Sequence, residues 1–268
     1  MPLGLVPVVL LLGSGALVGA TLGLVGGGRS VLAVPLLVYL VGVPSTHVAI
    51  GSSALAVAVN AAWGLANHAR LGTVKWPCGL VFGAAGVGGA LAGAAVGKQL
   101  GGTEVLAAFG AVMVAIGFYL LLANPQPSEE DVKLTHESAA HLLPRLLLIG
   151  VGVGLLSGFF GIGGGFLIVP GLILATGMRL QNAIGTSLFA VTVFGVVTAL
   201  SYAASGLVDW RITALVIAGG IFGTLAGAWA NKRLGDRRRA LSTIFAAMVI
   251  SAGFYVIGTG DAGLLATR

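Results

Sequence analysis

The chain has 268 residues, of which 57% are hydrophobic and only 8% are charged, and its formal net charge is +6. Soluble domains carry about 25% charged residues, so this chain has too few to cover a water-exposed surface and is expected to be an integral membrane protein. The single cysteine excludes an intrachain disulfide and a cysteine-rich metal site. The basic residues are spread over short loops, which excludes a nucleic-acid-binding patch.

The chain reads as ten apolar segments, five in each half. In chain order they cover 3–25, 31–43, 46–68, 77–98, 104–123, 144–160, 166–177, 180–204, 211–231 and 240–258. Most of them approach or exceed the roughly 20 residues that an α-helix needs to cross a bilayer. The only sustained polar stretch, 124–143, predicts a linker between two transmembrane repeats, 1–123 and 144–268. The expected fold is therefore an all-α polytopic membrane protein.

The two halves repeat each other in sequence. The matched blocks are 26–35 with 161–170, 51–53 with 185–187, 72–76 with 206–210, and 86–94 with 220–228. Four blocks in one order indicate an internal duplication. Five crossings per half is an odd number, so the second repeat is expected to be inverted relative to the first, as is typical of transporters that work by alternating access.

The distribution of basic residues favours ten crossings. If all ten segments cross, eleven of the 14 Lys and Arg residues share one side, which the positive-inside rule places in the cytoplasm together with the linker, with both termini outside. Segments 31–43 and 166–177 are short, about 18–20 Å against a hydrocarbon core of about 30 Å. A re-entrant path for these two segments stays an open alternative.

Two glycine-rich interruptions, 26–30 and 161–165, predict helix breaks inside apolar sequence. Bare N–H groups at the start of the following half-helix carry partial positive charge and suit an anion. The alternative is a tight turn between helices at the membrane surface. The substrate-binding residues predicted in the interruptions are Gly28, Arg29, Ser30, Gly163, Gly164 and Gly165.

Small hydroxyl residues recur at matched places in the two halves, as Ser52 and Ser53 and as Thr186 and Ser187. We expect the two pairs to meet at the repeat interface and offer neutral donors to a small oxyanion, although intramembrane Ser and Thr often serve helix packing alone. Polar groups at depth usually face the bundle interior. This adds three further candidate ligands, which are His47, Asn60 and Asn182.

All eight acidic residues fall in loops or at segment ends, so the interior offers donors and cations but no carboxylate. This favours an anionic substrate over a metal cation, and no cofactor or metal site is predicted. An enzyme is not expected, because neither His47 nor His68 has an acidic neighbour in sequence. The glycine runs 89–97 and 219–227, spaced by four, predict close helix–helix packing.

Gly161–Pro170, the following Ala183–Ser187, and the Gly-x-Val-x-Trp turns at 72–76 and 206–210 together resemble the TauE/SafE family of sulfite exporters, also called the toluene-sulfonate uptake permease family. The likeness covers about 15–258. It implies a multi-pass carrier of the cell inner membrane that exports sulfite, organosulfonates or similar small sulfur oxyanions, with the glycine motifs and neighbouring hydroxyls beside the substrate.

The first glycine motif departs from the family pattern, because Arg29 and Ser30 stand where the usual glycines would be. If Arg29 faces the cavity, it changes the preferred charge of the substrate. An anion channel and an importer of another small anion stay alternatives to the exporter. The expected partners are a small anionic substrate and membrane lipid, with no nucleic acid, and a homo-oligomer is left open.

Overall fold

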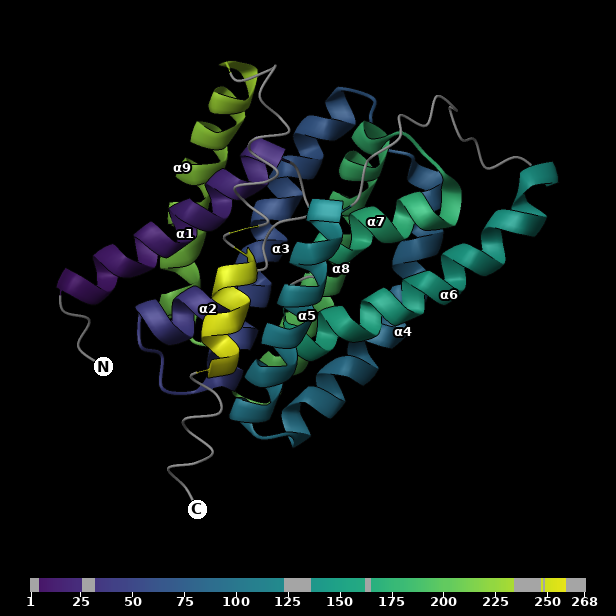
Figure 1. The fold of residues 1–268 in the computed structure, drawn as a ribbon. Coiled ribbons are helices and arrows are strands. Elements are labelled where there is room, and N and C mark those ends of the chain that lie inside the picture. The colour runs from purple at the N-terminus through teal and green to yellow at the C-terminus, as the bar shows by residue number, and fades with distance from the viewer. Residues whose placement is uncertain are drawn as a thin grey trace.

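The structure is a computed structural model that describes residues 5–25, 32–122, 136–161, 165–233, 247 and 249–258. The described chain is helical almost throughout, as expected (Figure 1). Its elements are α1 (Leu5–Val25), α2 (Ala33–Pro35), the π-helical turn η2 (Leu36–Leu40), α3 (Thr46–Arg70), α4 (Trp76–Gln99), α5 (Gly102–Leu122), α6 (His136–Phe160), α7 (Gly165–Thr176), α8 (Leu180–Ala203) and α9 (Trp210–Arg233). A further apolar helix covers Val249–Gly258.

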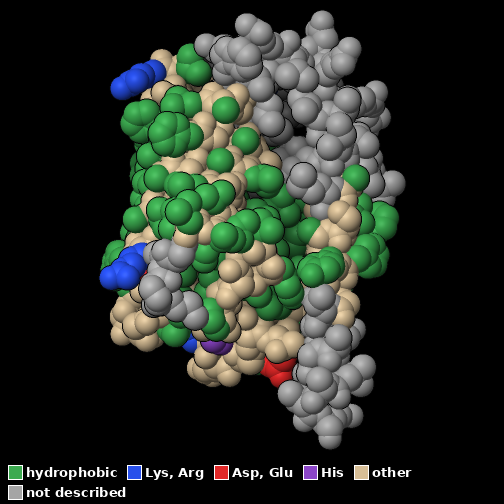
Figure 2. Space-filling model, turned by 90° about the vertical axis from the view of Figure 1, so that its left-hand side faces the viewer, with side chains coloured by type: hydrophobic (Ala, Val, Ile, Leu, Met, Phe, Trp, Pro, Cys, Tyr) green, Lys and Arg blue, Asp and Glu red, His purple; other side chains and the backbone are tan. Residues whose placement is uncertain are grey.

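Five helices are long and apolar enough to cross a membrane. They are α3, α4, most of α8, and the parts of α6 and α9 that run from Leu142 to Phe160 and from Trp210 to Gly227. On the face drawn in Figure 2, hydrophobic side chains cover much of the described surface, while Lys, Arg, His, Asp and Glu side chains lie towards its edges. Exposed large side chains such as Leu148, Leu174 and Phe222 are suited to contact with lipid. The chain is an integral membrane protein.

Helix α6 begins at His136, earlier than the apolar segment that was predicted from 144. The reason is that hydropathy marks the part of a helix that lies in lipid, whereas helix formation depends on propensity. Residues 137–143 are mostly good helix formers, with Glu, Ala and Leu prominent among them. The remaining part of the predicted linker, 124–135, lies outside the described residues.

The two short segments are as short as the sequence predicted. Helix α7 has 12 residues, about 18 Å of rise, and its counterpart in the first half is divided into α2 and η2. Each segment ends at a glycine with a left-handed backbone, Gly42 with φ 77° and Gly177 with φ 70°. A residue with a Cβ is strained in that conformation, so both turns require glycine. Neither short segment alone reaches across a hydrocarbon core of about 30 Å.

Each half of the chain packs one helix onto the other half. Helix α1 lies along α9, and α4 lies along α6. Gly219, Gly223 and Gly227 of α9 lie so close to carbonyl oxygens of α1 that an added Cβ would collide with them. Gly89 and Gly93 of α4 are equally close to carbonyl oxygens of α6. The predicted role of the two glycine runs in close helix packing is therefore confirmed.

Helices α3 and α8 pack against each other between these two pairs, and they run in opposite directions (Figure 1). Gly64 of α3 faces Leu188, and Gly195 of α8 faces Ala54 and Ala58. In the described core, α3 and α8 lie between the α1–α9 pair and the α4–α6 pair. Helix α3 packs most extensively on α8 and also contacts α9, while α8 also contacts α4.

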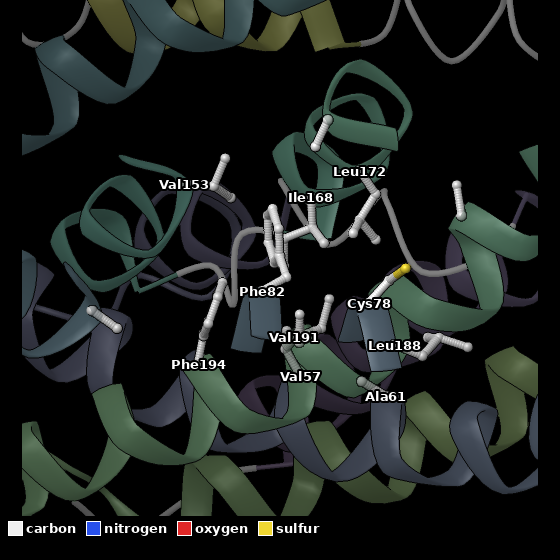
Figure 3. Packing of buried hydrophobic residues seen from close by; sticks show 14 of the residues in the cluster. Val57, Ala61, Cys78, Phe82, Val153, Ile168, Leu172, Leu188, Val191 and Phe194 are labelled. Carbon is white, nitrogen blue, oxygen red and sulfur yellow. The ribbon is translucent and has the colours of Figure 1, made fainter. Parts of the chain in front are cut away.

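A large hydrophobic cluster lies beside α8 and joins α3, α4, α6, α7 and α8 (Figure 3). Phe82 of α4 and Phe194 of α8 stack in it, with ring centroids 6.2 Å apart and an interplanar angle of 27°. Ile168 and Leu172 of α7 are fully buried in the same cluster. This packing fixes the position of α7, which follows the second glycine interruption.

Candidate functional site

Two equivalent hydrogen bonds connect the halves. The Ser52 hydroxyl on α3 accepts from the backbone N–H of Asp209 at 2.9 Å, and the Thr186 hydroxyl on α8 accepts from the backbone N–H of Lys75 at 2.9 Å. Ser52 and Thr186 occupy matched positions in the two repeats, and so do Asp209 and Lys75, each directly before the tryptophan that begins a helix. We call these two hydrogen bonds the hydroxyl clamps. They tie α3 to the start of α9 and α8 to the start of α4.

Glycine is required where the clamped loops approach α3 and α8. A Cβ on Gly51 would collide with the carbonyl oxygen of Leu207, and a Cβ on Gly185 would lie 3.0 Å from that of Thr73. Both loops begin with a left-handed glycine, Gly72 with φ 67° or Gly206. The sequence pattern of a glycine followed by hydroxyl residues therefore has a structural cause in both halves. The glycine leaves room for the loop to approach the helix, and the next hydroxyl forms a hydrogen bond with the loop.

The second hydroxyl of each pair bonds its own helix. Ser53 donates to the carbonyl of Ile50 at 3.0 Å, and Ser187 donates to the carbonyl of Ile184 at 2.7 Å. All four residues are fully buried. Their place in the substrate path stays a prediction, because in this conformation each of the four hydroxyls makes a hydrogen bond to the protein.

The structure does not bring the two hydroxyl pairs together. Gly51, next to Ser52, contacts Tyr202 near the end of α8, whereas Thr186 lies near the start of that helix. More than four helical turns separate Thr186 from Tyr202, about 24 Å along the axis. The expected meeting of the pairs fails because α3 and α8 are antiparallel, so equivalent positions lie at opposite ends of the contact.

Both helices stop at the glycine interruptions, as predicted. Helix α1 ends at Val25, α6 ends at Phe160, and Gly161 has a left-handed φ of 65° before α7 begins at Gly165. Five of the predicted site residues lie outside the described residues. These are Gly28, Arg29, Ser30, Gly163 and Gly164.

The residues that flank the two interruptions share one place in the fold. Gly161 is buried against Ile50, and a Cβ on it would lie 3.0 Å from the Ile50 carbonyl oxygen. Leu32, which follows the first interruption, and Phe160, which precedes the second, belong to the same hydrophobic cluster as Ile50. Leu167 of α7 packs against this cluster. The structure thus brings the flanks of both interruptions together beside the stretch of α3 that carries Ser52 and Ser53.

Asn60 is a predicted site residue that lies buried without partners. It is 3% exposed, and neither its side-chain oxygen nor its nitrogen has a hydrogen-bond partner. It packs against Gly220 of α9, and the matched residue Phe194 packs against Gly86 of α4. A buried polar group without a partner costs about 1–3 kcal/mol of folding free energy. The Asn60 amide therefore carries a cost that the aromatic ring of Phe194 at the matched position does not.

His47 and Asn182 lie half-buried in the first turns of α3 and α8. The Nδ1 atom of His47 is buried without a hydrogen-bond partner. The His47 ring lies 6.5 Å from the Tyr202 ring between centroids. Because α3 and α8 begin at opposite ends of their contact, His47 and Asn182 belong to different ends of the molecule.

Sequence reasoning missed a set of buried hydroxyls without hydrogen-bond partners. They are Ser14 on α1, Ser157 on α6, and Thr198 and Tyr202 on α8. None of them has a hydroxyl at the matched position of the other half, so the sequence repeat does not indicate them. Tyr202 did carry a signal, because its counterpart is the polar residue His68.

Apart from Arg145 within α6, the charged side chains that the structure describes lie at or next to helix ends. Glu104 lies in the first turn of α5 and Asp209 lies directly before the first turn of α9, where a carboxylate is stabilised by the helix dipole. The Asp209 carboxylate accepts from the backbone N–H groups of Arg211 at 2.9 Å and of Ile212 at 3.2 Å. These acidic groups stabilise the starts of α5 and α9.

The chain matches the family model described as Sulfite exporter TauE/SafE over residues 11–256. The chain belongs to the TauE/SafE family. The match takes in both repeats, both clamps and the flanks of both interruptions.

Relatives of this TauE/SafE protein carry transporter names. A "Probable membrane transporter protein" of Xylella fastidiosa is 42% identical over 96% of this chain and 98% of its own length. The "Probable membrane transporter protein YunE" of Bacillus subtilis is 27% identical over 94% of this chain and 98% of its own length. No solved structure matches the chain. The family and these relatives identify the TauE/SafE chain as a membrane transporter.

Proposed function

We propose that this TauE/SafE protein is a secondary transporter of the inner membrane that exports a small sulfur oxyanion, such as sulfite or an organosulfonate. The observation that carries the proposal is the shared position of the two interruptions. Leu32, Phe160 and Leu167 flank them and lie in or against one cluster with Ile50. Two backbone breaks at one place are typical of the substrate sites that transporters build from discontinuous helices.

An anion suits this place chemically. The first N–H groups of α7 have no partner within the helix, and they carry the positive end of the helix dipole. Arg29 belongs to the first interruption in sequence and adds a cation there. We assign Gly28, Arg29, Ser30 and Gly163–Gly165 to the substrate, with Ser53 on the neighbouring stretch of α3. This assembly has the donors of an anion-binding site.

We further propose that the two repeats are inverted and that transport proceeds by alternating access. The antiparallel arrangement of the equivalent helices α3 and α8 supports the inversion (Figure 1). The reciprocal clamps, Ser52 to Asp209 and Thr186 to Lys75, support it too, since a two-fold relation turns each clamp into the other. Movement at the α3–α8 contact would then expose the interruptions to one side of the membrane and afterwards to the other.

The test is flux of radiolabelled sulfite, sulfate and toluene-sulfonate in proteoliposomes that contain the purified protein. The wild type is expected to carry sulfite or the sulfonate with saturable kinetics and counterflow, and a channel would show no counterflow. Arg29→Gln removes the proposed cation and should raise KM for the anion about tenfold, equivalent to about 1.4 kcal/mol. Arg70→Gln is the matched control, because Arg70 is exposed at the end of α3. Equal kinetics in the wild type and Arg29→Gln would contradict the proposed site.

A further inference from the structure

The end of the molecule where α3 begins and α8 ends holds a second group of polar side chains. Tyr202 of α8 is 0% exposed, and its hydroxyl has no hydrogen-bond partner. Its ring centroid lies 6.5 Å from that of His47 on α3, whose Nδ1 is also buried without a partner. Two unpartnered polar atoms, contributed by the two helices whose contact must change during transport, therefore lie in one small region.

At the other end of the α3–α8 pair, the residue equivalent to Tyr202 has a hydrogen-bond partner. His68 occupies the position of Tyr202 in the first repeat, and its Nδ1 lies 2.9 Å from the Thr73 hydroxyl. Thr73 corresponds to Leu207 in the second repeat, so the residue that would replace this partner is apolar. At the other end, the Tyr202 hydroxyl has no hydrogen-bond partner in the protein. A structural role alone therefore does not account for this hydroxyl.

The charge beside Tyr202 is positive. The Lys98 ammonium lies 5.7 Å from the centroid of the Tyr202 ring. It donates to the Ser201 carbonyl and to the Ser201 and Ser205 hydroxyls, each at 3.1 Å, so all its partners are uncharged. Of the acidic groups at this end, the Asp209 carboxylate accepts from the first turn of α9, and Glu104 is exposed in the first turn of α5.

We propose that Tyr202 and His47 form a second binding site for the transported oxyanion, at the end of the α3–α8 pair where Lys98 lies. The Tyr202 hydroxyl and the Nδ1–H of His47 donate to the anion, and Lys98 supplies the charge. Both donor atoms are buried in this conformation, and the Tyr202 hydroxyl lies beside Gly97 of α4. The site opens when the packing of α3 and α4 around Tyr202 loosens at this end, and it receives the anion on its way to or from the interruptions. This inference rests on the proposed function.

The decisive variant is Tyr202→Phe, which removes one hydroxyl and keeps the ring. Sulfite flux in proteoliposomes is expected to show a KM about tenfold above the wild-type value, which is about 1.4 kcal/mol, with an unchanged melting temperature in detergent. His47→Phe should also raise KM. Tyr39→Phe is the matched control, because Tyr39 is a half-buried tyrosine whose ring packs edge-on against Tyr255. Its kinetics should equal those of the wild type.

The outcomes separate the two proposals. A wild type that carries sulfite, with unchanged KM and kcat in Tyr202→Phe, overturns the second site and leaves the proposed function standing. A lower melting temperature for Tyr202→Phe shows that the hydroxyl has a structural partner, and this also overturns the second site. A wild type that carries none of the anions overturns the proposed function and the second site together.

Discussion

Replacing Thr186 by Val tests the hydroxyl clamps. Val has nearly the shape of Thr, so the substitution removes the acceptor for the Lys75 N–H and creates no cavity. The lost hydrogen bond is 2.9 Å long, and Thr186 is fully buried. A net contribution of about 1 kcal/mol is typical for a protein hydrogen bond, and burial raises the loss towards about 2 kcal/mol. At about 2–4 °C per kcal/mol for a chain of this size, the melting temperature should fall by about 2–8 °C.

The assay is thermal unfolding of the purified protein in detergent, with Thr192→Val as the control. Thr192 lies on the same helix and is half-buried, and its hydroxyl donates to the Leu188 carbonyl of its own helix at 2.7 Å. That carbonyl can still accept the helical N–H, so Thr192→Val should stay within about 0.5 kcal/mol of the wild type. If Thr186→Val and Thr192→Val melt together, the clamp does not contribute to stability and the reasoning is refuted.

Two further pairs of substitutions test the helix packing and the start of α9 by the same thermal unfolding assay. Gly93→Ala should destabilise the protein by about 1–3 kcal/mol, because the new methyl group meets the Leu155 carbonyl of α6. Gly88→Ala, on the open side of α4, should instead stabilise the protein by up to about 1 kcal/mol. A stability change of the same sign in both variants would contradict the packing. Asp209→Ala should cost about 1 kcal/mol through loss of the helix cap, and Asp209→Asn should cost clearly less; equal losses would contradict the capping role.

The sequence predicted the fold well where physical chemistry acts locally. Longer glycine runs favour a helix stop, so the stops near Val25 and Phe160 followed from composition, whereas the glycine pairs at 88–89 and 219–220 lie inside α4 and α9. Glycines spaced by four share one helix face, and only close packing of another helix explains such a face in lipid. The early start of α6 at His136 was missed because a polar helical extension looks like a linker when hydropathy alone is considered.

The candidate site was less predictable, because its contacts join residues far apart in the chain. The repeat identified Ser52 and Thr186 as equivalent, but nothing in one sequence identifies Asp209 and Lys75 as their partners. Their separation by about 24 Å follows from the antiparallel packing of α3 against α8, which is a tertiary property. Tyr202 carried a sequence signal through its polar counterpart His68, but only the structure shows that its hydroxyl has no partner.

The pairing of α1 with α9 has a consequence for biogenesis. Helix α1 enters the bilayer early in synthesis, yet the surface that covers Gly15 and Gly19 is made only when most of the chain has left the ribosome. Until then its glycine face meets lipid tails, which cannot follow so narrow a groove. The nascent protein must therefore hold α1 without its main partner while α2 to α8 are synthesised.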